Sequence, residues 1–160
     1  MVEIIPAIIA QNIGEVEEKI RLVEPYVSWA QLDIMDGEFV VQRTWNNPSE
    51  LSDIATSVRL EADLMVYDPL RDAMPWIASR VERVFVQIET LHGSEEVFTM
   101  IDKIRGSGKD VGLTLNVETP VETVYPYTDS IDWVLLRGGT PGSYGQPFQN
   151  VVIEKVRTLR

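Results

Sequence analysis

The stretch Gln31-Leu32-Asp33-Ile34-Met35-Asp36-Gly37-Glu38-Phe39-Val40 decides how the rest of this chain is interpreted. Its first half reads as a buried strand, and alternate residues of a strand point to one side of the sheet. Asp33 therefore shares a side with Gln31 and Met35. A carboxylate held on a buried strand costs free energy unless it is paired, bound to a metal or used in chemistry. The stretch predicts a strand that delivers a carboxylate to a functional loop.

Length and composition favour a single globular domain over residues 1–160. Hydrophobic residues make up 44% and charged residues 24% of the chain, which is typical of such domains. The formal net charge of −11 predicts neither nucleic acid nor an anionic membrane as a partner, because both attract basic surfaces. No apolar stretch approaches the roughly 20 residues that span a bilayer. The absence of cysteine and of a basic leader at the N-terminus predicts a cytoplasmic protein.

Short apolar runs alternate with amphipathic segments along the whole chain. We predict strands at residues 4–10, 29–35, 59–67, 84–89, 111–117 and 132–137. We predict helices from residue 12 or 14 to about 25, at 48–56, from 68 onward, from 93 to about 106, at 121–127 and at 151–159. Repeated strand–helix units predict a parallel α/β sheet with right-handed crossovers.

Polar residues on three neighbouring strands separate a barrel from an open sheet. They alternate with apolar residues, and they are Gln31, Asp33, Glu61, Asp63, Gln87 and Glu89. Under the helices of an open sheet such groups would be costly, whereas in a barrel they line the lumen and the site at the carboxyl ends of the strands. We therefore predict an incomplete parallel (β/α) barrel of the TIM type, with about six strand–helix units.

Several segments, in family order, resemble ribulose-phosphate 3-epimerases. The opening stretch resembles the V-D-x-M-D-G-x-F-V signature of that family. The other matching segments are Pro6-Ala7-Ile8-Ile9-Ala10, Leu64-Met65-Val66 with Asp68-Pro69, Leu115-Asn116 with Thr119-Pro120, Pro141-Gly142 with Gly145-Gln146, and Ile153-Glu154-Lys155-Val156-Arg157. The resemblance covers nearly the whole chain and implies one ribulose-phosphate-binding barrel domain over residues 1–160.

The resemblance implies a reaction that inverts the carbon next to the ketone of a ketopentose phosphate. In the family, two acids work on opposite faces, and a divalent metal held by two histidines and two aspartates stabilises the enediolate. Asp33 falls on the first aspartate, which is both ligand and acid/base, while Gln31 and Asp63 fall on the two histidines. The second aspartate, on the family's seventh strand, has no counterpart. Asp63 and the carbonyl oxygen of Gln31 could ligate a hard cation, but we expect the metal site not to be retained.

Four further positions bear on ligand binding. By the resemblance, Met35, Met65 and Gly142 match positions around the substrate, and Arg137 replaces a methionine at the end of the sixth strand. A guanidinium there could neutralise an inward carboxylate without any metal, or it could capture the phosphate or carboxylate of a ligand. The candidate partners for neutralisation are Asp33, Asp63 and Glu89.

Three functions remain open, and the first two belong to different classes. The first is an epimerase of this family, acting on a sugar phosphate through Asp33, with the ancestral reaction impaired or lost. The second is a non-catalytic barrel relative that serves as a binding or assembly module; a metal-free enzyme on another sugar phosphate is a third. Unpaired edges on the first and sixth strands predict association of the chain into a homo-oligomer.

Overall fold

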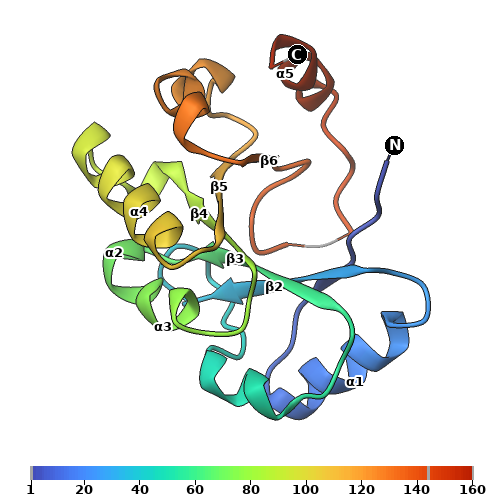
Figure 1. The fold of residues 1–160 in the computed structure, drawn as a ribbon. Coiled ribbons are helices and arrows are strands. Elements are labelled where there is room, and N and C mark those ends of the chain that lie inside the picture. The colour runs from blue at the N-terminus through green and yellow to red at the C-terminus, as the bar shows by residue number, and fades with distance from the viewer. Residues whose placement is uncertain (1, 144, 160) are drawn as a thin grey trace.

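Six parallel strands form one curled sheet in this computed structural model, which describes residues 2–143 and 145–159. The strands are β1 (Ala7–Ile8), β2 (Trp29–Met35), β3 (Arg59–Met65), β4 (Arg83–Gln87), β5 (Asp110–Leu115) and β6 (Trp133–Leu136). Each strand pairs with the next one along the chain, so the strand order never reverses as it does in a doubly wound sheet. Figure 1 shows the strands curling round a common axis with helices outside them. The predicted incomplete TIM-type barrel is confirmed.

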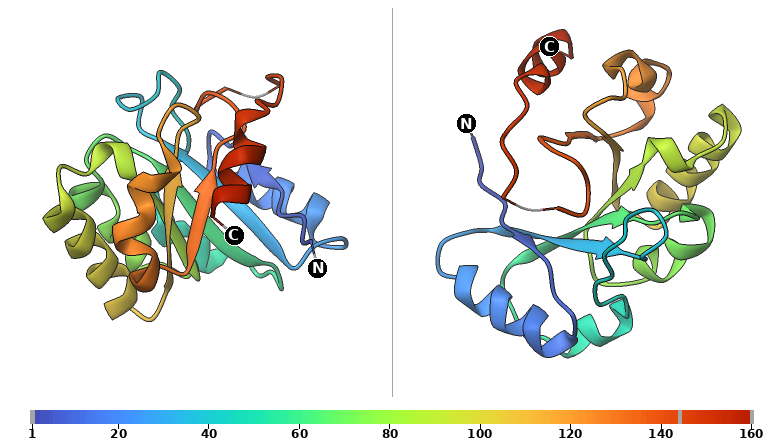
Figure 2. Two further views of the ribbon diagram at one scale, coloured as in Figure 1. Left: turned by 90° about the horizontal axis from the view of Figure 1, so that it is seen from above. Right: turned by 180° about the vertical axis from the view of Figure 1, so that it is seen from behind.

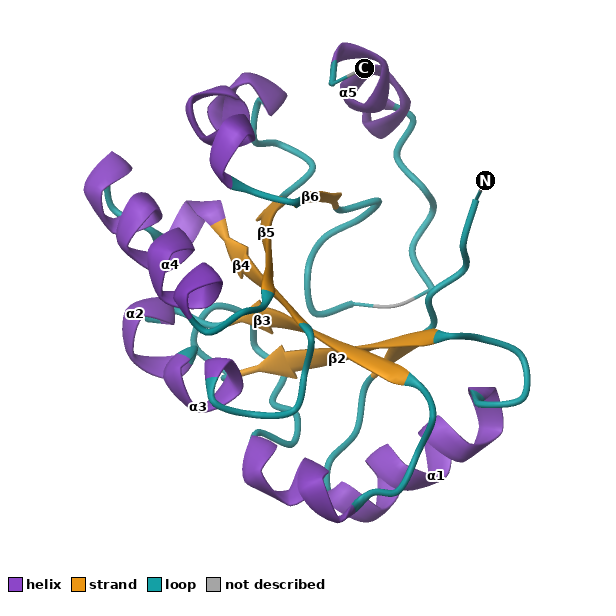
Figure 3. Ribbon diagram, viewed as in Figure 1, coloured by secondary structure: helices purple, strands orange, loops and turns teal. Residues whose placement is uncertain are grey.

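Helices cover the outer side of this sheet (Figure 3). They are α1 (Ile13–Val23), α2 (Pro69–Asp72), α3 (Met74–Ile77), α4 (Ser94–Gly106) and α5 (Val151–Thr158), with 3-10 helices at η1 (Pro48–Asp53), η2 (Ile88–Thr90) and η3 (Val121–Ser130). Asn12 begins α1 by accepting a hydrogen bond from the Glu15 amide at 3.0 Å. Pro75 lies in the first turn of α3, where a proline is tolerated because its missing N–H would have no partner.

Several boundaries differ from the sequence prediction. The first strand was predicted at residues 4–10 but is only Ala7–Ile8, the two residues that pair in register with Gln31 and Leu32 of β2. The fourth strand ends at Gln87, so Glu89 lies in η2 and not on the strand. The second and fifth predicted helices are 3-10 helices.

The two sides of the sheet have opposite chemistry. The outward residues of β2 and β3 are apolar and belong to the core beneath the helices; they are Ala30, Leu32, Ile34, Leu60, Ala62 and Leu64. The inward residues include Gln31 and Asp33 of β2, paired in register with Glu61 and Asp63 of β3. The period of two along each strand thus directs the carboxylates into the lumen, as the alternation predicts.

The amino end of the lumen is filled by an aromatic and cationic stack. The Arg83 guanidinium lies 4.3 Å from the Trp29 ring centroid and 3.8 Å from that of Trp133, and its Nη1 donates to Glu61 at 2.5 Å. Above this stack the Phe85 ring occupies the space of a side chain at Gly112, where a Cβ would lie 2.1 Å from Phe85 Cδ1. The open part of the lumen therefore lies at the carboxyl ends of the strands.

The barrel wall is interrupted between β1 and β6. Among the described strands these two are the ends of the sheet, and Figure 2 shows the opening beside α5 and the N-terminal segment. Apolar side chains are exposed around it, with Ile4 at 78%, Trp133 at 45% and Val151 at 48% of full exposure.

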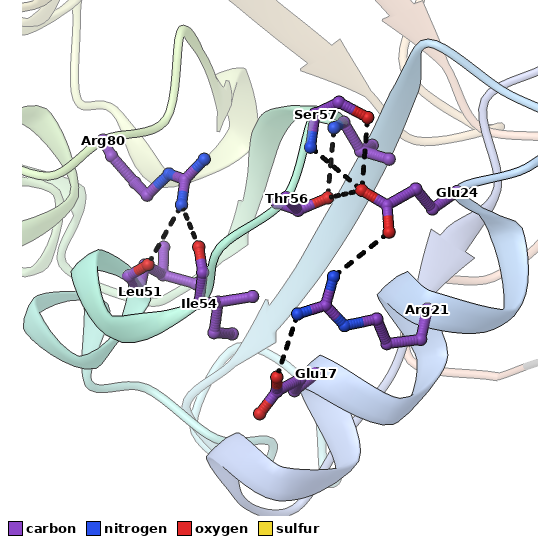
Figure 4. Close-up of polar contacts among 9 residues, drawn as sticks. Glu17, Arg21, Glu24, Leu51, Ile54, Thr56, Ser57 and Arg80 are labelled. Atoms are coloured by element: carbon purple, nitrogen blue, oxygen red, sulfur yellow. Dashed lines mark hydrogen bonds and ion pairs between the residues drawn. The ribbon is translucent and has the colours of Figure 1, made fainter.

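On the outside, Glu24 ties the end of α1 to the segment before β3 (Figure 4). Its carboxylate accepts hydrogen bonds from Thr56 Oγ1 at 2.7 Å and from the Ser57 amide at 2.9 Å, and Arg21 pairs with it at 3.2 Å. The bonds from Thr56 and Ser57 lower the pKa of Glu24 to about 2. The carboxylate thus contributes to the docking of α1.

Candidate functional site

A cavity of about 580 Å³ opens at the carboxyl ends of the strands. Most of the residues that the sequence analysis singled out line it, namely Gln31, Asp33, Met35, Met65, Arg137 and Gly142. Asp63 does not line the cavity, because its side chain is fully buried beneath the surface. A concave site at this end of the strands is where barrel enzymes carry out their chemistry.

Asp33 presents a carboxylate to this cavity from β2. Gln31 Nε2 donates a hydrogen bond to Asp33 Oδ1 at 2.7 Å, which orients the group. Asp63 stands beside it in register on β3. Burial raises the pKa of Asp33 most and the charge of Asp63 adds to the rise, while the hydrogen bond from Gln31 and the charge of Arg137 oppose it; the resulting pKa is about 6. The carboxylate is therefore a stronger base than an exposed aspartate, and it is still ionised at neutral pH.

Arg137 neutralises Asp63 inside the barrel wall. Its Nη2 lies 2.7 Å from Asp63 Oδ2, while Thr114 Oγ1 and Gln87 Nε2 lie 3.3 Å and 3.5 Å from Asp63 Oδ1. Burial raises the pKa of Asp63, and the Arg137 guanidinium is the strongest opposing influence. Asp63 is thus the partner of Arg137 among the three candidates that the sequence left open.

The other two nitrogens of the Arg137 guanidinium lack hydrogen-bond acceptors among the described residues. Nε is buried and has no hydrogen-bond partner, and Nη1 donates no hydrogen bond within residues 2–143 and 145–159. The backbone amide of Arg137 donates to the Leu115 carbonyl at 3.1 Å, which anchors the residue just beyond β6. Glu89 is engaged elsewhere, since it accepts hydrogen bonds from the Asn116 amide and the Thr119 hydroxyl.

The loop after β6 folds over the cavity. Gly142 has φ +76°, and a Cβ there would lie 2.8 Å from Gln42 Oε1 and 2.9 Å from Val40 Cβ. Only glycine allows both this backbone conformation and this close approach. Gln146 holds the loop by accepting from the Thr140 amide at 3.3 Å and donating to the Thr140 carbonyl at 3.1 Å. The loop thereby meets the segment that follows β2 and forms one wall of the cavity.

A second cavity, of about 640 Å³, adjoins the first. The two share Ala7, Ile9, Met35 and Gly142, and the second is also lined by Gln11, Glu15, Lys19, Gln42, Arg43 and Thr44. Lys19 Nζ donates to the Ile9 carbonyl at 2.5 Å. The sequence analysis identified neither Lys19 nor Arg43, because nothing in the local pattern of α1 or of the loop after β2 marks them. Thr114 and Gln87 were also missed as partners of Asp63, although both occupy inward strand positions.

The donor set does not fit the metal site that the resemblance implies. Asp63 has one oxygen bonded to Arg137 and the other shared by Thr114 and Gln87. The part of the chain that the structure describes contains no group of three or more His, Cys, Asp or Glu side chains that could hold a metal ion. Asp33 and the Gln31 carbonyl oxygen alone are too few ligands for a divalent cation.

The described helices include none with the length and apolar character needed to cross a membrane.

Comparison with known proteins gives a consistent set of matches. A family model described as the Ribulose-phosphate 3 epimerase family matches residues 3–160. Ribulose-phosphate 3-epimerase of Chlamydia muridarum is 28% identical over 98% of this chain and 68% of its own length. The cytoplasmic isoform from Oryza sativa subsp. japonica is 30% identical over 99% of this chain and 71% of its own length. The chloroplastic Ribulose-5-phosphate-3-epimerase of Arabidopsis thaliana is 28% identical over 97% of this chain, which spans 56% of that protein.

A solved structure is similar in fold alone. An enolase family member from Agrobacterium tumefaciens, with homology to dipeptide epimerases, superposes with a TM-score of 0.56 at 13% identity. The similarity covers 78% of this chain and 36% of that one.

Proposed function

The chain belongs to the ribulose-phosphate 3-epimerase family, and from this membership we propose that its cavity binds a ketopentose phosphate or a related sugar phosphate. We further propose that the metal-dependent epimerisation at C3 is impaired or lost. The sugar would lie against Met35, Met65 and Gly142, which line the cavity and match positions around the family's substrate. The net charge of −11 would repel a phosphate at long range, so backbone amides near the cavity would have to supply the attraction for the phosphate.

The observation that carries this proposal is the bond between Arg137 and Asp63. Asp63 falls on a ligand position of the family, yet both of its oxygens are already engaged. A metal ion could bind there only by displacing the guanidinium, which would leave a charged Arg137 without its partner. Asp33 is also the only carboxylate among the described residues that line the cavity, whereas inversion needs an acid on each face.

The test is a direct assay with D-ribulose 5-phosphate. Calorimetry measures binding of the sugar phosphate to the metal-free chain, and NMR follows formation of D-xylulose 5-phosphate with and without added Mn²⁺ or Zn²⁺. We expect binding without metal and little or no stimulation of epimerisation by metal. Rapid epimerisation that depends on a stoichiometric metal would refute the proposal of loss, and absence of any binding would refute the proposed ligand.

The alternative is a non-catalytic binding or assembly module. Its support is that two of the inward acidic groups are consumed in ion pairs, Asp63 with Arg137 and Glu61 with Arg83. The exposed apolar side chains at the edges of the sheet favour association between copies of the chain, and we propose a homo-oligomer located in the cytoplasm. Light scattering after gel filtration measures the mass; a monomer at micromolar concentration would contradict the oligomer.

A further inference from the structure

We propose that Asp33 and Arg137 form a metal-independent proton-exchange site for an α-hydroxy ketone, in which exchange occurs on one face and the carbon is not inverted. The inference rests on the proposed function, because it takes a ketose phosphate as the ligand of the cavity. It assigns Asp33 as the base that removes the proton. It assigns Arg137 to the carbonyl oxygen, which becomes negatively charged.

The two groups enter the same cavity from strands far apart in the sheet. Asp33 comes from β2 and Arg137 follows β6, and both line the cavity. In each side chain, one polar atom is bonded to the protein and a second polar atom has no partner among the described residues. Gln31 holds Asp33 Oδ1 at 2.7 Å, while Oδ2 accepts no hydrogen bond from the described residues. Asp63 holds Arg137 Nη2 at 2.7 Å, while Nη1 has no acceptor in the same part of the chain. One unused carboxylate oxygen and one unused donor thus share a space large enough for a small sugar.

A purely structural ion pair does not account for this arrangement of Arg137. The Asp63 carboxylate is fully buried with both oxygens bonded, whereas Nε and Nη1 of Arg137 have no acceptor among the residues that the structure describes. An unsatisfied buried donor costs about 1–3 kcal/mol and is uncommon in folded proteins. Nε is too deeply buried for a ligand to reach, but Arg137 lines the cavity, and its unpaired Nη1 suits an oxyanion because of the charge and planar donors of the guanidinium.

The proton transfer balances without any co-reactant. The Asp33 carboxylate takes the proton from the carbon next to the ketone, and the C–H electron pair forms a carbon–carbon double bond. The carbonyl electron pair moves to oxygen, giving an enediolate whose negative charge lies beside Arg137. Neutral Asp33 then returns a proton to the same carbon, and the ketone is restored. A preplaced donor on such an oxyanion is worth about 10²–10³ in rate.

The geometry also predicts the stereochemical outcome. Asp33 is the only carboxylate lining the described part of the cavity, and no lysine or histidine lines that part. The carbon therefore receives its proton from the face that lost it. In D₂O the substrate should gain deuterium at C3 and keep its configuration, in contrast to the two-faced inversion of the family.

The experiment uses the chain in D₂O with EDTA and D-ribulose 5-phosphate. Proton NMR measures loss of the C3–H signal, mass spectrometry measures the gain of one deuterium, and NMR detects any D-xylulose 5-phosphate. We expect exchange without xylulose product. Asp33→Asn should abolish exchange. Arg137→Lys, which keeps a positive charge for Asp63, should slow exchange about 10²-fold with the Kd changed only a few fold. Arg71→Lys, on an exposed pair with Asp72, is the matched control and should exchange at the parent rate.

The other possible results each overturn a stated part of the proposal. Binding of the sugar phosphate without exchange would overturn this inference and leave the proposed ligand intact, whereas absence of binding would overturn both. Exchange that disappears in EDTA, or that yields xylulose in step with deuterium, would also overturn it. Equal exchange rates for folded Arg137→Lys and the parent chain would reduce Arg137 to a structural role.

Discussion

Replacing Arg137 by methionine tests the ion pair on which this account depends. Methionine keeps an unbranched stem in the wall of the lumen but removes the guanidinium 2.7 Å from Asp63. The Asp63 side chain is 0% exposed and that of Arg137 11% exposed, so the remaining carboxylate has no access to water. Removing one partner of a buried pair typically costs about 3–5 kcal/mol. Thr114 and Gln87 still donate to Asp63, so we expect a loss near the lower value, about 3 kcal/mol.

Urea unfolding followed by circular dichroism at pH 7 gives the free energies for the parent chain and its variants. The double variant Arg137→Met with Asp63→Asn removes both charges while Asn keeps an oxygen for Thr114, so it should recover more than half of the loss. Arg157→Met, which breaks an exposed pair with Glu154, is the control and should cost less than about 1 kcal/mol. If Arg137→Met matched this control, or if the double variant were no more stable than the single one, the reasoning would be refuted.

Three further predictions concern other parts of the molecule. Asp33→Asn should raise the free energy of unfolding by about 3 kcal/mol at pH 7, because a pKa of about 6 against the ordinary 3.8 disfavours the charged carboxylate in the fold. The free energy of unfolding of the parent chain should fall by this amount as the pH rises from about 4 to 6, because Asp33 becomes charged in the fold. Urea unfolding at pH 4 should therefore show no gain for Asp33→Asn, and a gain that persists at pH 4 would contradict the pKa shift as its cause. Glu24→Gln should destabilise the fold at pH 7, since the charged form is favoured by a pKa lowered to about 2, and thermal melts should show the difference shrinking as the pH falls toward 2. Gly112→Ala should cost about 1–3 kcal/mol by overlapping the Phe85 ring, whereas Gly106→Ala, with nothing within 4 Å of the new methyl group, should not destabilise; equal melting temperatures would count against the close packing of the lumen.

The sequence was most informative where a strand carries its own pattern. Alternation of Gln31 and Asp33 with apolar neighbours predicted both the lumen and its position at the carboxyl ends of the strands, because a period of two is a local property. The same rule failed at Glu89, since the alternation continues past Gln87 where the strand has already become η2. The pattern of side chains alone does not mark where strand pairing stops.

Long-range contacts explain most of what the sequence did not reveal. An inward guanidinium at Arg137 predicted a carboxylate partner, but the choice of Asp63 depends on how strongly the sheet curls between β3 and β6. The approach of Gly142 to Val40 joins two loops about a hundred residues apart, and no local signal encodes it. The second cavity beside Lys19 arises in the same way, from the packing of α1 against a loop.

The central claim is that a guanidinium–carboxylate pair stands where relatives are expected to hold a metal. The most direct measurement is the metal content of the purified chain by mass spectrometry, together with calorimetric titration of Zn²⁺, Mn²⁺ and Mg²⁺. The account predicts no stoichiometric metal and no saturable binding that depends on Asp63. One tightly bound equivalent per chain, lost on substitution of Asp33 or Asp63, would contradict it.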